Sequence, residues 1–237
     1  MTGTIQSAYS DRQIVAWFRG LYTIALADGY YDPKEQELIG QLTQDLANID
    51  GVNRLESITP EELAEKLGKE PDTAENFLRT AVLVAVADGV YSAPEYELLH
   101  QFSAALEIKI EALKALENNL YRPEAAKAAA ATVDASDSAF FLTPPEKSKS
   151  SVDVLYPVKD WLEGMEVKDP RLAKFICRVI PPQCPFERDI NLFGRKIAHI
   201  PPLCKLNPLY EQFTLLRFRS LSYLADECGE DVTKYVQ

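Results

Sequence analysis

Two acidic segments with the same order of residue types lie 60 positions apart in the chain. Residues 25–39 and 85–99 agree at eight of fifteen positions. Ordinary residue frequencies would give about one agreement by chance, so the segments are a duplication. In each copy an aspartate is followed seven positions later by a glutamate. Such carboxylates can accept charge-assisted hydrogen bonds or bind hard cations. The four residues are Asp28, Glu35, Asp88 and Glu95.

Each copy is predicted to form a helix, a tight turn and a second helix. A glycine follows each aspartate and is expected to end the first helix in the left-handed conformation. The second helix is expected to begin after an N-cap, Asp32 or Ser92. A glutamate three residues later, Glu35 or Glu95, completes a capping box. The two glutamates therefore have a structural explanation.

The two repeated aspartates have no such explanation from the helices alone. Asp28 and Asp88 are expected at helix C-termini, where the macrodipole disfavours a carboxylate by roughly 0.3–1 kcal/mol. Backbone N–H groups of the next helix could compensate, or a cation shared with the nearby glutamates. Oxygen ligands would select Ca²⁺ or Mg²⁺, but the spacing does not fit an EF-hand loop. Both explanations stay open.

The duplicated signature resembles that of the tellurite-resistance TerB family. The resemblance covers about residues 10–120 and rests on the Ala-Asp-Gly of both copies with the later glutamate. It implies an all-helical domain with acidic patches for divalent metal, in stress-response or membrane-linked complexes. By the resemblance, Asp28, Glu35, Asp88 and Glu95 form the acidic site. It does not imply tellurite resistance itself.

All four cysteines lie in the second half of the chain. Two end an Ile-Pro-Pro-x-Cys motif that occurs twice, 20 positions apart, at Cys184 and Cys204. No pair has the Cys-x-x-Cys spacing typical of zinc or iron–sulfur sites. Buried, reduced thiols are the favoured interpretation. A thiol site at Cys184 and Cys204, serving a small metal or redox sensor, is the alternative.

Residues 155–237 resemble the domain family labelled Mo-dependent nitrogenase C-terminal. The resemblance rests on Cys-Pro-Phe-Glu-Arg-Asp from Cys184, on Ile-Pro-Pro-Leu-Cys from Ile200 and on Leu-Arg-Phe-Arg from Leu216. It implies a cyanobacterial source and no established biochemical role. A segment this short, without a paired cysteine motif, is not expected to house nitrogenase clusters.

Charge is distributed unevenly along the chain. Residues 1–150 hold 13 basic and 24 acidic residues, whereas residues 151–237 hold 12 of each. The acidic half disfavours nucleic acid as a partner. A basic stretch in the second half predicts docking onto an acidic protein or an anionic membrane surface. Two alternatives are simple solvation of helix faces and pairing with the acidic half of the same chain. The basic residues are Arg178, Arg188, Arg195, Lys196, Arg217 and Arg219.

Hydrophobic periodicity predicts an all-α fold. A duplicated helix-turn-helix bundle over residues 10–121 is expected before an Ala/Pro/Ser linker at 122–151 and a small, proline-interrupted helical domain at 152–237. The predicted helices span 14–27, 35–47, 61–67, 77–87, 95–106, 109–120, 170–179, 187–198 and 208–228.

The sequence favours a binding or scaffolding protein over an enzyme. Neither a nucleophile elbow, a phosphate-binding glycine loop nor a zinc-protease motif is present. The polar N-terminus predicts no signal peptide, and no apolar run approaches the roughly 20 residues of a membrane span. We therefore expect a cytoplasmic protein, able to associate peripherally with a membrane.

Overall fold

The computed structural model describes residues 7–27, 55–68, 70–86, 91–120, 155–180, 182, 188–192, 195–200 and 209–236. For 117–120 and the two strands, the backbone alone is described. The first half contributes α1 (Asp11–Ala25), α3 (Pro60–Leu67), α4 (Pro71–Ala85), α5 (Ala93–Ala105) and α6 (Glu111–Leu120). The second half contributes α8 (Tyr156–Glu163), α9 (Pro170–Val179), β1 (Arg188–Leu192), β2 (Arg195–Ile200), α11 (Tyr210–Ser222), the π-helix η1 (Tyr223–Glu227) and α12 (Thr233–Val236). The fold is all-α, as predicted, with one added hairpin.

Side-chain caps fix where the helices of the first half begin. The Thr59 hydroxyl caps α3 by accepting from the backbone N–H of Glu62. The predicted capping box of α5 is confirmed: the backbone N–H of Ser92 donates to Glu95 Oε2 at 2.9 Å, and Ser92 Oγ accepts from the backbone N–H of Glu95. Each cap satisfies N–H groups that have no partner inside the helix.

The second half departs from the prediction at one element. The helix expected at 187–198 is wrong: β1 and β2 form an antiparallel hairpin with Arg188 opposite Ile200. In β1, Ile190 and Leu192 alternate with polar residues, and such a period of two is typical of a strand rather than a helix. α9 matches its predicted bounds. The helix predicted at 208–228 is described as α11, which begins after its N-cap Leu209 and is followed by the wider turn η1.

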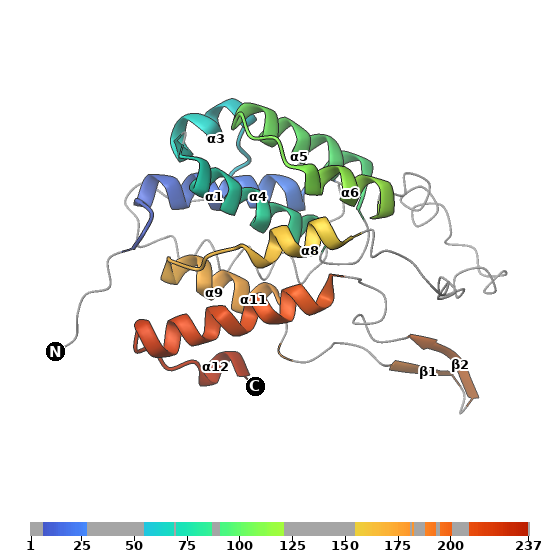
Figure 1. Ribbon diagram of the computed structural model, residues 1–237. Coiled ribbons are helices and arrows are strands. Elements are labelled where there is room, and N and C mark those ends of the chain that lie inside the picture. The colour runs from blue at the N-terminus through green and yellow to red at the C-terminus, as the bar shows by residue number, and fades with distance from the viewer. Residues whose placement is uncertain are drawn as a thin grey trace.

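One hydrophobic core runs through both halves of the chain. It joins residues of α1, α3, α4 and α5 with residues of α8, α9 and α11. The rings of Phe18 and Phe175 meet edge-on at 5.3 Å between centroids. Trp17 lies fully buried against Phe77 and donates its indole N–H to Thr80 Oγ1 at 3.1 Å. Figure 1 shows the two groups of helices packed as layers, with the hairpin standing apart. The linker predicted at 122–151 lies outside the described residues.

A buried carboxylate fastens the N-terminal segment to α9. The Asp169 side chain is fully buried and accepts from the backbone N–H of Arg171 at 2.8 Å and from Arg171 Nη2 at 3.0 Å. It also accepts from the Ser7 hydroxyl. Arg171 in turn donates to Asp11 at the start of α1. Burial alone would raise the pKa of Asp169, but the bonds from Arg171 and Ser7 hold it below its usual value.

A second polar cluster joins α4 to α8. Arg79 donates to the carbonyl oxygen of Trp161 at 2.8 Å, and its guanidinium lies 5.5 Å from the Trp161 ring centroid. Glu75 accepts from both Arg79 and the indole N–H of Trp161, at 3.0 and 2.7 Å. These bonds satisfy polar groups where the halves meet. Among the described residues, no helix is long and apolar enough to cross a membrane.

Candidate binding groove

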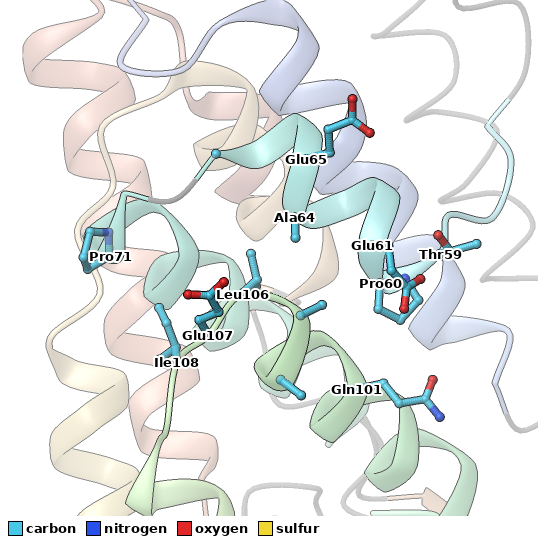
Figure 2. Close-up of a pocket in the computed structure, with 13 residues that line it drawn as sticks. Thr59, Pro60, Glu61, Ala64, Glu65, Pro71, Gln101, Leu106, Glu107 and Ile108 are labelled. Carbon is cyan, nitrogen blue, oxygen red and sulfur yellow. The ribbon is translucent and has the colours of Figure 1, made fainter.

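An open groove of about 1030 Å³ lies between α3 and the C-terminal end of α5. Figure 2 shows α3 on one side of it and α5 with the turn after α5 on the other. One end lies at the α3 N-cap and the other near Pro71 at the start of α4. Its lining residues are Thr59, Pro60, Glu61, Ala64, Glu65, Gly68, Pro71, Gln101, Ala104, Ala105, Leu106, Glu107 and Ile108.

Small and aliphatic residues line the groove between its polar edges. Ala64 on α3 faces the end of α5, where Ala104 and Ala105 lie. Leu106 and Ile108 continue this surface into the following turn. Larger side chains at these positions would fill the groove. Because alanine is small, the helix backbones themselves form much of the groove walls. The exposed lining is more apolar than polar.

Two carboxylates on α3, Glu61 and Glu65, differ from their neighbour Glu62 in their surroundings. Glu62 accepts from Arg19 at 2.7 Å and pairs with Lys66, and the hydrogen bond from Arg19 lowers its pKa most. Glu61 and Glu65 are exposed and form no ion pair within the part of the chain that the structure describes. Because they lie four residues apart on one helix face, they repel each other slightly.

Glu107 adds a third carboxylate to the groove from an unusual backbone position. Its φ of 59° is left-handed, and it is the one described non-glycine residue with a positive φ. Here α5 ends in a Schellman motif: the N–H of Glu107 donates to Ala104 O and that of Ile108 to Ser103 O. Glycine is preferred at this position because a Cβ costs roughly 1–2 kcal/mol in the left-handed region.

The predicted acidic site is described at one of its four residues. Glu95 lies at the start of α5, where its carboxylate completes the capping box with Ser92. Asp28, Glu35 and Asp88 lie outside the described residues. Among those described, no group of three or more Asp, Glu, His or Cys residues could hold a metal ion. The cation therefore stays a prediction.

The predicted basic face needs one correction. Arg217 is buried, with 7% of its surface exposed, and donates to Ile180 O at 2.7 Å and to Tyr235 O. It anchors α12 and cannot contact a partner. Arg219 is exposed on α11 and donates to Glu163 O, and Arg178 lies partly buried in the last turn of α9. Of the remaining three residues, Arg188 is in β1, and Arg195 and Lys196 are in β2.

Both described cysteines have thiols that ionise less readily than a free cysteine. Cys177 is buried in α9, and burial raises its pKa to about 11. Burial also raises the pKa of Cys228, although a hydrogen bond with Tyr223 opposes this. Cys184 and Cys204 lie outside the described residues, so the thiol site predicted for them stays a prediction.

Comparison with known proteins found a similarity in the C-terminal part of the chain. Residues 154–236 match the family described as Mo-dependent nitrogenase C-terminus. The match includes every described element from α8 to α12. Comparison with curated proteins and with solved structures gave no match. The resemblance of residues 10–120 to TerB stays a prediction from the repeat.

Sequence reasoning missed the carboxylates beside the groove. The pair Glu61 and Glu65 carried a signal, since two like charges four apart on a predicted helix mark an acidic face. Glu107 carried none, because a left-handed glutamate after a helix cannot be distinguished by residue type from an ordinary surface glutamate. The repeated aspartates Asp28 and Asp88 have the stronger pattern in the sequence, but they are not among the residues that line the groove.

Proposed function

We propose that this chain is a non-enzymatic binding or scaffolding protein whose groove between α3 and α5 receives a segment of a protein partner. The supporting observation is the combination of an alanine-rich surface with three nearby carboxylates. Small-molecule sites enclose most of their ligand. A groove that is open to solvent along its length instead suits a protein segment that lies across the surface.

The shared core supports a scaffolding role in a second way. Residues from both halves pack into one hydrophobic cluster, and the Asp169 and Arg79 clusters tie the halves together. A partner in the groove would therefore be held in a fixed orientation to the segment that matches the nitrogenase C-terminus family. The basic residues Arg178 and Arg219 on that segment give a second contact region in the proposal.

Site-specific photo-crosslinking in cells tests this function. A photoreactive residue at the exposed groove position Gln101 should yield an adduct with a discrete protein, because Gln101 lines the groove. The matched control is Glu97, also exposed on α5 but outside the groove lining. Equal adduct patterns at both positions, or adducts with neither, would contradict binding in the groove.

Cation response is a separate part of the proposal. If Asp28 and Asp88 share Ca²⁺ or Mg²⁺ with the repeated glutamates, either ion should raise the thermal midpoint of the wild type. Asp28→Asn and Asp88→Asn should remove that increase. A wild-type midpoint that neither ion changes would show the cation to be superfluous. The groove proposal does not depend on the result.

A further inference from the structure

We infer that α11 and η1 together form a contact surface for a second copy of this chain. The two copies would lie antiparallel, related by a two-fold axis close to Ser222, so that each copy uses the same residues. This surface belongs to the second half of the chain and is independent of the groove between α3 and α5. The partner is an identical chain, and the assembly is a weak symmetric dimer.

Two large apolar side chains of α11 face away from the core. Leu215 and Phe218 are 38% and 66% exposed, whereas Phe213 and Leu216, on the other side of the helix, are buried. Figure 1 shows α11 in front of α9, which packs against that buried side. Leu215 and Phe218 are three residues apart and therefore lie on one helix face. Contact with a second apolar surface would remove Phe218 from water, which is favourable.

A hollow of about 730 Å³ lies beside this face, between α11 with η1 and the segment that joins α8 to α9. The charges that line it are separated along the helix. Arg219 comes first, and Asp226 and Glu227 follow about two turns later on η1, roughly 10 Å further along the axis. The remaining lining charges, Glu166 and Lys168, form an ion pair with each other. The hollow therefore has a cation near one end of the helical face and two carboxylates near the other.

Antiparallel packing would bring each Arg219 to the carboxylates of the other copy. Ser222 lies three residues after Arg219 and four before Asp226. Two chains that cross at Ser222 would therefore place Arg219 of one copy opposite Asp226 of the other, and would do so twice. Ser222 is small and partly exposed, which permits a close approach of the two helices. On the other side of the crossing, Phe218 would pack on Ala225 of the second copy.

The internal contact of Arg219 is compatible with this pairing. Its Nη1 donates to the Glu163 carbonyl oxygen at 2.6 Å. A guanidinium carries five N–H donors, so this bond does not exhaust them. Because the bond already restricts the side chain, less conformational entropy is lost when the second copy binds.

The mixture of charges favours a second copy over an anionic membrane as the occupant. An anionic surface would attract Arg219 but would repel Asp226 and Glu227, which line the same hollow. A second copy instead offers each charge an opposite one. A symmetric dimer requires this kind of self-complementary surface.

Sedimentation velocity of the full-length chain tests the inference. Between about 5 and about 300 µM the average mass should rise from that of one chain toward that of two, because a single helix contact gives a small and weak interface. Phe218→Asp should weaken this association more than about tenfold, since it places a charge at the centre of the contact. The matched control is Tyr156→Asp. Tyr156 is 63% exposed on α8 and does not line the hollow, so this variant should associate like the wild type.

Exchanging the charges separates self-association from a purely structural effect. Arg219→Asp alone, or Asp226→Arg alone, would place like charges opposite each other at both pairs, and each variant should associate about tenfold more weakly than the wild type. In an equimolar mixture of the two variants, every pair again joins opposite charges. The mixture should associate within about threefold of the wild-type affinity. Far-UV circular dichroism confirms that each variant is folded.

Three results would each overturn the inference. They are a wild-type mass that stays at one chain up to about 300 µM, wild-type association of Phe218→Asp, and a mixture of the two charge variants that associates no better than either variant alone. A monomeric wild type that binds vesicles containing phosphatidylserine through Phe218 would assign this face to a membrane instead. Photo-crosslinking at Gln101 reports on the groove between α3 and α5, so its outcome is separate from these results.

Discussion

The buried Asp169 offers the sharpest test of how the two halves are held together. Asp169→Asn keeps the size of the side chain and one acceptor oxygen for the backbone N–H of Arg171. The new amide nitrogen, however, would face two donors, Arg171 Nη2 and the Ser7 hydroxyl. The Ser7 hydroxyl, which also donates to Tyr9 O, can accept from the new amide, so the substitution removes the charge and the acceptor of the Arg171 Nη2 bond.

The expected loss follows from the exposure of the partners. Removing one member of a buried ion pair costs about 3–5 kcal/mol. Here Asp169 is fully buried but Arg171 is 24% exposed and keeps its bond to Asp11, so we expect about 2–4 kcal/mol. For a chain of 237 residues this corresponds to a fall in melting temperature of roughly 5–15 °C. Asp226→Asn, an exposed carboxylate on η1, should change it little.

The pH dependence gives a second readout. The folded pKa of Asp169 is held below its ordinary value of 3.8. Its contribution to stability is therefore present above that value and is lost as the pH falls through the folded pKa. The wild-type advantage over Asp169→Asn should be full at about pH 7 and shrink below about pH 4. A melting difference under about 2 °C at neutral pH, or one unchanged at low pH, would refute the reasoning.

Three further predictions concern the core and the C-terminal helices. Gly20→Ala should lower the free energy of unfolding by about 1–3 kcal/mol, because an added Cβ would lie 2.8 Å from the Phe77 ring. A lower urea midpoint would measure this loss. Arg217→Met should destabilise by about 2–4 kcal/mol and open α12 to carboxypeptidase, since two carbonyl groups lose their donor; unchanged digestion would contradict this. Cys177 should react with iodoacetamide at about pH 8 many times more slowly in the folded chain than in urea, because burial raises its pKa to about 11; peptide mapping by mass spectrometry measures both rates.

Local signals in the sequence were sufficient for most of the helices. Thr59-Pro60 and the box of Ser92 and Glu95 fix helix starts through bonds within four residues, so no distant contact is needed. The Pro170 start of α9 follows in the same way from Asp169 as its N-cap. The hairpin at 188–200 was missed because its strands have only five and six residues, too few for the alternating pattern to outweigh a helical interpretation.

Long-range features could not be predicted from the sequence. The pairing of Asp169 with Ser7 joins residues 162 positions apart, and nothing local to either indicates it. Arg217 is in the sequence one of several basic residues in a charged stretch, yet packing places it inside. The groove likewise forms where α3 meets the end of α5, through a tertiary contact between segments distant in the chain. These features depend on packing between distant segments, which local secondary-structure propensity does not describe.

The common core has a consequence for dissecting the protein into fragments. A fragment ending near residue 120 would leave Phe18 and the α4 face around Arg79 without their partners from α8 and α9. A fragment starting near residue 155 would expose Phe175 and Trp161 in turn. Each fragment alone should expose an apolar surface and tend to aggregate. Co-expressed, the two should reassemble without a covalent connection, as in a split reporter, with the Phe18–Phe175 contact and the bonds of Arg79 to Trp161 restoring the interface.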